Sequence, residues 1–292
     1  MPAPSISPRA DSLPLPAGSC NAHVHVFGPR ERFPYARDAG FIPEADAPKE
    51  ALYALNDGLG LTRCVVVQST CHGRDNSAAE DAVRSRAGSY VGIALVGADV
   101  ADSELRRLNE AGFRGVRFNY MSHLGASTPL DDVLALAGRI EPLGWHLQIH
   151  FDSSLIAELA PALKRSPVPV VIDHMGRVDA SLGLEQPAFG ALRRLLEDER
   201  FWVKVSGCDR SSRQGPPYAD AVPFARRLVA EFPQRTLWGT DWPHPNISGP
   251  IPDDRLLAGL LAEIAPDALS LQRLLVDNPQ RLYRFAPTEV AQ

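Results

Sequence analysis

Cysteine is scarce in this chain, and its four cysteines form no Cys-x-x-Cys pair. Cys20, Cys64, Cys71 and Cys208 are scattered, so a disulfide scaffold is not expected in a chain of 292 residues. This usage favours a reducing compartment, and we expect a cytoplasmic protein. Cys71, next to His72, is a candidate nucleophile, but a buried or loop thiol is the more frequent situation.

Long hydrophobic runs and an excess of positive charge are also missing. No apolar run approaches the roughly 20 residues needed to cross a bilayer, so no membrane is expected as a partner. A formal net charge of -5 gives no reason to expect nucleic acid either. Residues 1–17 are rich in Pro, Ser and Ala and contain no secretory signal. We expect them to be a flexible leader or arm, with residues 18–292 forming one catalytic domain.

The remaining chain alternates short apolar runs with helical patterns. Strands are expected at 20–27, 63–68, 90–96, 115–119, 145–151, 168–174, 201–206 and 236–241. Helices are expected at 49–59, 75–87, 100–111, 130–143, 154–165, 188–196, 219–232, 256–264 and 269–277. The strands lack polar alternation, as in parallel sheets that are buried on both faces. Eight such units predict an α/β fold of the (β/α)8 TIM-barrel type. A doubly wound open sheet is the alternative, but the sequence has no GxGxxG turn.

Polar side chains recur at the carboxyl ends of the predicted strands, where barrel enzymes place their active sites. His23 and His25 are two residues apart, so in a strand they share one face. Of the eight histidines, six lie at or just beyond a strand's carboxyl end. The residues collected there include His23, His25, Thr70, Arg117, His150, His174, Arg177, Arg210 and Asp241. Chance clustering is the weaker explanation of this pattern.

Two kinds of chemistry suit these residues. Neutral imidazoles and a carboxylate are ligands that zinc prefers, and the ion would lower the pKa of a bound water. Alternatively, an aspartate acts as general base towards water while histidines polarise a carbonyl. Structural roles compete with both: Asp241 could cap a helix, and the arginines could form salt bridges at the barrel rim. We interpret Lys204 as a buried ion-pair partner and His146 as a core residue.

The set of strand-end histidines and aspartate resembles the amidohydrolase superfamily. Longer motifs resemble its 2-pyrone-4,6-dicarboxylate lactonase group, which acts in the catabolism of lignin-derived aromatic compounds. They are NAHVHVFGP at 21–29, QSTCHG at 68–73, GVRFN at 115–119, IDHMGR at 172–177, CDR at 208–210 and GTDWPHPN at 239–246. The resemblance covers essentially the whole chain beyond the leader.

The resemblance implies a hydrolase that opens the ring of a small anionic lactone without requiring a metal. Asp241 would be the base for water, and His23, His25 and His174 would polarise the carbonyl. Substrate carboxylates would be held by Arg117, Arg177, Arg210 and Thr70, with Asn246 nearby. Guanidinium groups suit carboxylates because they can pair with both oxygens.

Three positions depart from the lactonase pattern. Phe41 and His150 stand where the group has tyrosines, and His123 stands where it has a second arginine. We expect all three at the substrate pocket, where they remove two hydroxyls and one permanent charge. His150 also restores a ligand position of the wider superfamily, so a single zinc ion held by His23, His25, His150, His174 and Asp241 is the alternative. The competing functions are a zinc-dependent lactonase for a sulfonated muconolactone or a sugar-acid lactone, a decarboxylase or hydratase, and a catalytically idle sensor of anions.

Overall fold

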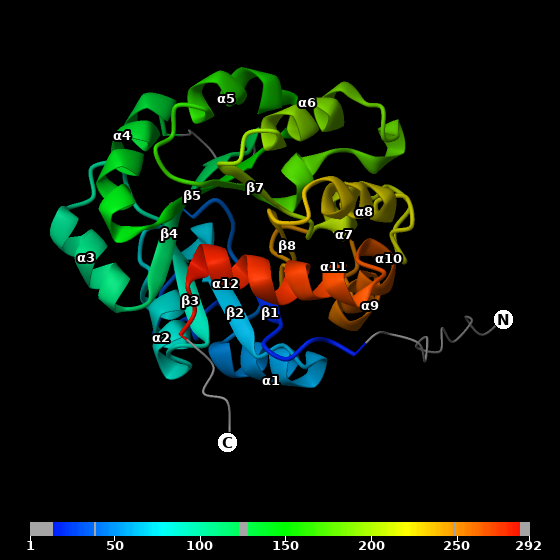
Figure 1. Ribbon diagram of the computed structural model, residues 1–292. Coiled ribbons are helices and arrows are strands. Elements are labelled where there is room, and N and C mark those ends of the chain that lie inside the picture. Colours follow the sequence, from blue (N-terminus) through cyan, green and yellow to red (C-terminus); the bar gives the residue numbers. More distant parts are fainter. Residues whose placement is uncertain (1–13, 38, 123–127, 248, 287–292) are drawn as a thin grey trace.

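A parallel sheet of eight strands forms the centre of the computed structural model, which describes residues 14–37, 39–122, 128–247 and 249–286 (Figure 1). Each strand pairs in parallel with the next one along the chain. The strands are β1 (Cys20–Val24), β2 (Arg63–Val67), β3 (Tyr90–Ala94), β4 (Phe113–Tyr120), β5 (His146–Phe151), β6 (Val170–Ile172), β7 (Phe201–Lys204) and β8 (Thr236–Leu237). This order is that of the predicted barrel.

Backbone hydrogen bonds close the sheet on itself. The Ala22 N–H donates to the carbonyl of Trp238 over 2.8 Å, just beyond the end of β8. Further along, the Asp241 N–H donates to the carbonyl of His23 over 2.9 Å. Because these bonds join the last strand to the first, the prediction of a (β/α)8 barrel is confirmed.

Helices surround the barrel and cover its outer face (Figure 1). They are α1 (Lys49–Leu59), α2 (Ser77–Ser85), α3 (Asp102–Glu110), α4 (Leu130–Ile140), α5 (Ile156–Leu163), α6 (Pro187–Leu196), α7 (Cys208–Ser211), α8 (Val222–Glu231), α9 (Asp254–Gly259), α10 (Leu261–Ile264), α11 (Ala268–Gln272) and α12 (Asn278–Tyr283). Helix α4 shows why they pack: its buried Val133, Leu136, Ala137 and Ile140 recur at helical spacing and form one apolar face. No described helix is long and apolar enough to cross a membrane.

Side chains of the strands alternate between two cores. In β2, Cys64 and Val66 pack with the helices, whereas Val65 and Val67 belong to a separate cluster inside the barrel. Tyr283, at the end of α12, packs into the same inner cluster. The C-terminal helix therefore closes the amino end of the barrel, and the polar residues occupy the opposite end.

A bulge in β1 sets the direction of the first histidine pair. Asn21 is paired with Cys64 and Val24 with Val66, so β1 has one residue more than β2 over this stretch. An extra residue reverses the alternation of side chains. Ala22 thus faces the inner cluster, and the next residue, His23, also points into the barrel.

The observed strands β6 and β8 are shorter than the predicted ones. The segments that follow them turn sharply, because His174, Met175, Arg177 and Asp241 all adopt positive φ angles between 47° and 65°. Backbone in this region is unusual for residues other than glycine and commonly marks functional sites. Because of these turns, His174 and Asp241, which were predicted to end strands, lie in the segments beyond them at the barrel mouth. Residues 1–13 of the expected leader lie outside the described residues.

We predict that His146 makes the fold sensitive to acid. Burial, with a contribution from the charge of Lys204, lowers the pKa of this core histidine to about 3. Below pH 6.5 the unfolded state therefore binds a proton that the folded state excludes, and this site costs about 1.4 kcal/mol of stability for each further pH unit. In urea unfolding between about pH 7 and pH 4.5, His146→Gln should lose stability less steeply than the wild type. Identical slopes for the two proteins would contradict the prediction.

Candidate active site

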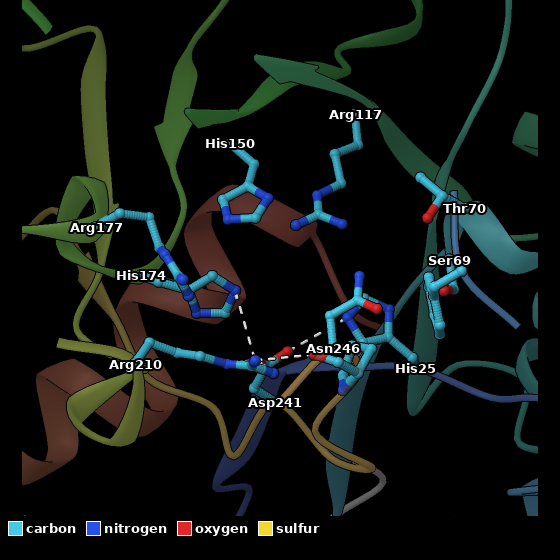
Figure 2. Close-up of a pocket in the computed structure, with 12 residues that line it drawn as sticks. His25, Ser69, Thr70, Arg117, His150, His174, Arg177, Arg210, Asp241 and Asn246 are labelled. Atoms are coloured by element: carbon cyan, nitrogen blue, oxygen red, sulfur yellow. Dashed lines mark hydrogen bonds and ion pairs between the residues drawn. The ribbon is translucent and has the colours of Figure 1, made fainter. Parts of the chain in front are cut away.

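A pocket opens at the carboxyl ends of the strands (Figure 2). Its walls come from strands β4 and β5 and from the segments that follow β1, β2, β6, β7 and β8. The lining residues are His25, Phe41, Ser69, Thr70, Arg117, His150, His174, Arg177, Arg210, Asp241, Pro245 and Asn246.

The structure brings most of the predicted site residues together here. Ten of the lining residues were predicted as site residues. Ser69, in the QSTCHG motif, was expected at the same strand end but was assigned no role, and Pro245 was not predicted. His23 lies fully buried beside the pocket, 3.7 Å from Asp241. His123 lies outside the described residues.

Asp241 presents one engaged and one unengaged oxygen. Its Oδ2 accepts a hydrogen bond from Arg210 Nε over 2.9 Å, and Arg210 Nη2 lies 2.7 Å away. Its Oδ1 has no hydrogen-bond partner among the described residues. Burial alone would raise the pKa of Asp241, but the Arg210 guanidinium and the nearby imidazoles hold it well below its usual range. Asp241 is therefore ionised, with one oxygen free to accept a proton.

The imidazoles of His23, His25 and His174 lie near this carboxylate, and Figure 2 shows the last two. Atom Nε2 of His25 lies 3.3 Å from Asp241 Oδ1, and Nε2 of His174 lies 3.8 Å from Oδ2. His25 Nδ1 is 2.8 Å from the carbonyl of Val67. Because a carbonyl can only accept, Nδ1 carries a proton and Nε2 of a neutral His25 is an acceptor. His174 Nδ1 is 3.0 Å from the hydroxyl of Ser206.

Burial keeps two of the pocket histidines uncharged. It lowers the pKa of His174 to about 3. The pKa of His150 is also held well below its usual value by burial and by the charge of Arg117. At neutral pH both rings are therefore neutral and can serve as hydrogen-bond donors or acceptors.

A buried polar network lies beneath the pocket and was not foreseen as a unit. Asp173 Oδ2 accepts hydrogen bonds from Arg117 Nε over 2.9 Å and from Gln148 Nε2 over 3.1 Å. Lys204 lies 3.5 Å from the other oxygen of Asp173 and 3.1 Å from Nδ1 of His23. The interpretation of Lys204 as a buried ion-pair partner agrees with this arrangement. Gln148 could have been recognised because it shares the strand face of His150.

The three pocket arginines differ in what they contact. Arg117 is paired with Asp173, and Arg210 is paired with Asp241. Arg177 has no hydrogen-bond or ion-pair partner among the described residues, and burial lowers its pKa. A partly buried guanidinium without a partner favours an anionic ligand.

Two of the positions that depart from the lactonase pattern lie in the pocket wall. His150 Nδ1 is 3.2 Å from Asn119 Oδ1, while its Nε2 has no partner among the described residues. Phe41 packs against Phe27, with 5.8 Å between the ring centroids. This part of the wall therefore offers an imidazole and an apolar ring rather than hydroxyl groups.

Within the part of the chain that the structure describes, two groups of side chains could hold a metal ion by residue type and spacing. They are His23, His25 and Asp241, and His23, Asp173 and His174, with potential ligand atoms within 4.8 Å of one another in each group. His150 belongs to neither. Both groups share His23, whose Nδ1 faces the ammonium of Lys204. A metal-bound histidine ordinarily donates its other N–H to an acceptor. Asp173 Oδ1, 3.3 Å from this nitrogen, is an acceptor, but Lys204, which can only donate, lies nearer at 3.1 Å. With Lys204 at that position, and Arg210 on Asp241, the arrangement disfavours a divalent ion.

Known proteins resemble this chain over nearly its whole length. The family described as amidohydrolase matches residues 20–285. A 2-pyrone-4,6-dicarboxylate hydrolase of Comamonas testosteroni is 48% identical over 95% of this chain and 93% of its own length. A 4-sulfomuconolactone hydrolase of Rhizobium radiobacter is 39% identical over 96% of both chains. A crystal structure from Acinetobacter baumannii, named as a probable 2-pyrone-4,6-dicarboxylic acid hydrolase with citric acid bound, is 27% identical, with a TM-score of 0.80 over 92% of this chain and 100% of its own.

Proposed function

The chain belongs to the amidohydrolase family, and we propose that it is a lactonase that hydrolyses a small carboxylated lactone such as 2-pyrone-4,6-dicarboxylate. The observation that carries this proposal is the free oxygen of an ionised Asp241 beside three imidazoles, in a pocket that also contains an unpaired arginine. The relatives named as lactone hydrolases support the same activity. Four free, buried cysteines support our proposal of a cytoplasmic enzyme.

Asp241 acts as the base for water in the proposed reaction. As a water oxygen attacks the lactone carbonyl carbon, Oδ1 accepts the proton that the water loses. The ester bond of the ring then breaks, and the proton passes to the departing ring oxygen, giving a carboxylic acid and a hydroxyl. Arg210 keeps Oδ2 engaged and thereby directs Oδ1 towards His23 and His25.

Imidazoles stabilise the charge that develops on the carbonyl oxygen. His23 and His174 lie within 3.8 Å of Asp241 and are held neutral by burial, so each can offer an N–H without bringing a positive charge. Donors that are fixed in a water-excluded site contribute strongly to the stabilisation of such oxyanions. His25 Nε2 and Asp241 Oδ1 lie 3.3 Å apart and face the same space, where they orient the attacking water by accepting its hydrogen bonds.

Arg177 is the proposed principal ligand of a substrate carboxylate. Arg117 and Arg210 are already paired with buried aspartates, which leaves only their remaining N–H groups for substrate. Thr70 and Asn246 line the same pocket and can add hydrogen bonds. The bound citric acid in the related structure is itself a polycarboxylate, which is consistent with an anion site in this group.

A sulfonated lactone is the second candidate substrate. The 39% identical relative is named for 4-sulfomuconolactone, and a sulfonate, like a carboxylate, would suit the unpaired Arg177. Phe41 and His150 remove hydroxyls that the 2-pyrone-4,6-dicarboxylate lactonase pattern would supply. The preference for a carboxylated or a sulfonated lactone therefore depends on the part of the pocket wall formed by Phe41 and His150, where this chain differs from that pattern.

A panel of lactones tests the proposed function directly. We expect kcat/KM for 2-pyrone-4,6-dicarboxylate to exceed that for 4-sulfomuconolactone and for a neutral lactone, and to survive removal of metals by a chelator. Higher activity on the sulfonated lactone would establish the second candidate, and loss of activity after chelation would refute the metal-free reaction. Thermal stabilisation by these compounds without any turnover would identify a sensor instead of an enzyme.

Replacing the base should separate turnover from binding. Asp241→Asn keeps the size of the side chain but removes the negative charge that accepts the proton, so kcat should fall by at least about 10³-fold. Substrate binding, measured by calorimetry, should largely survive. Asp102→Asn, which alters an exposed aspartate paired with Arg139, is the control and should leave both quantities unchanged. Turnover by Asp241→Asn close to that of the wild type would refute the assignment.

Removal of Arg177 should weaken binding of the anionic substrate. Arg177→Gln is expected to raise KM about 10- to 100-fold, since a charge-assisted pair contributes about 1.5–3 kcal/mol. The effect should be absent for a neutral lactone of similar size. Arg213→Gln, at an exposed arginine paired with Asp179, serves as the matched control. An equal loss for charged and neutral lactones would show that Arg177 is not the carboxylate ligand.

A further inference from the structure

Lys204 is a buried cation without a role in the chemistry proposed so far. It ends β7, points into the barrel and is fully shielded from solvent. Its Nζ lies 2.7 Å from Gln148 Oε1, 3.1 Å from His23 Nδ1 and 3.5 Å from Asp173 Oδ1. An ammonium group has three N–H bonds and no acceptor. Lys204 therefore makes hydrogen bonds with Gln148 and His23, and Asp173 is its ion-pair partner.

Gln148 shows that Lys204 donates to this network. The amide nitrogen of Gln148 donates to Asp173 Oδ2 over 3.1 Å, which turns its oxygen towards Lys204. Because Lys204 can only donate, the nitrogen that it contacts on His23 must accept. A neutral imidazole that accepts at Nδ1 carries its proton on Nε2.

Asp173 competes for the same nitrogen of His23. Its Oδ1 lies 3.3 Å from Nδ1 and would accept an Nδ1–H if the proton were there. The placement of that oxygen does not meet the geometry of a hydrogen bond with any described residue, whereas Lys204 meets it at Nδ1 over 3.1 Å. An Nδ1–H would also point at the ammonium group. The contact with Lys204 therefore decides where the proton of His23 resides.

We propose that Lys204 is a positioning residue that holds His23 in the tautomer with its proton on Nε2, so that an N–H rather than a lone pair faces Asp241 Oδ1 beside the pocket. Nε2 has no partner among the described residues, and the nearby Asp241 Oδ1 is also without one. An N–H directed at this space suits the oxyanion of the attacked carbonyl. This use of the donor rests on the proposed lactonase function, but the tautomer itself does not.

The two histidines of the first motif then have opposite roles. His25 carries its proton on Nδ1, towards the carbonyl of Val67, and presents an acceptor at Nε2. His23 carries its proton on Nε2 and presents a donor. A metal ion would need lone pairs from both rings. Lys204 is thus the residue that favours carbonyl polarisation over metal binding at this pair.

The tautomer can be observed without any substrate. In long-range ¹H–¹⁵N spectra of the wild-type protein, assigned by comparison with His23→Gln, His23 should show a protonated Nε2 and an unprotonated Nδ1. His25 should show the reverse pattern. A protonated Nδ1 on His23 would overturn the proposal, and this measurement requires no variant of Lys204 to fold.

Lys204→Met tests the cause. This change removes the donor and leaves Asp173 as the only partner of His23 Nδ1, so the His23 proton should move to Nδ1. Calorimetric titration of the metal-stripped proteins with zinc chloride should then show at least tenfold tighter binding by Lys204→Met than by the wild type. Lys49→Met, at a lysine paired with Asp81 away from the pocket, should bind zinc as the wild type does. Equal zinc affinity in wild type and Lys204→Met would contradict the assignment.

Kinetics then connect the tautomer to the reaction. Without added metal, Lys204→Met should lose about 10²-fold in kcat, the typical effect of removing one oxyanion donor, with little change in KM. If the spectra show the expected tautomer but the wild type hydrolyses no lactone, the proposed function fails and the assignment of Lys204 stands. If turnover is normal in Lys204→Met, Nε2 of His23 is not the donor to the carbonyl.

Discussion

The buried polar network beneath the pocket depends on one charge, the carboxylate of Asp173. Burying a single charge is costly unless it is paired and hydrogen-bonded. Asp173 has such partners in Arg117 and Gln148 on one oxygen, and Lys204 lies 3.5 Å from the other. These side chains come from β4, β5 and β7, so the network also joins strands that are not all neighbours. Removing any one of them would leave the others with an unbalanced charge or an unpaired donor.

The same network controls how protons are placed in the pocket above it. Lys204 contacts His23, which lies next to Asp241, and Arg117 reaches from Asp173 to the pocket wall. Three buried imidazoles with lowered pKa values and one ionised aspartate result from this environment. A site of neutral donors around one base suits ester hydrolysis, in which the charge appears only in the transition state.

Much of this protein could be predicted from its sequence because parallel barrels obey simple rules. Each strand of a (β/α)8 barrel delivers its carboxyl end to the same mouth, so His25, His174 and Asp241 were placed together from their positions alone. The lining residues confirm that these groups meet. Strand alternation predicted that His23 and His25 point the same way. In the structure Ala22, directly before His23, also faces inward, because β1 bulges by one residue relative to β2. A bulge depends on pairing with β2 and leaves no signal in the spacing of β1.

The sequence by itself determined the fold, the end of the barrel that carries the site and the residue types available there, because these follow from local patterns and chain order. Only the tertiary structure decided which arginine is unpaired and which nitrogen of each histidine carries a proton. Arg177 and Arg210 are chemically identical, and they differ only in whether an aspartate lies within reach. Likewise His23 and His25 differ through Lys204 and the carbonyl of Val67, which come from strands far apart in sequence. Protons are placed by contacts of about 3 Å between distant segments, and such contacts exist only after the chain has folded.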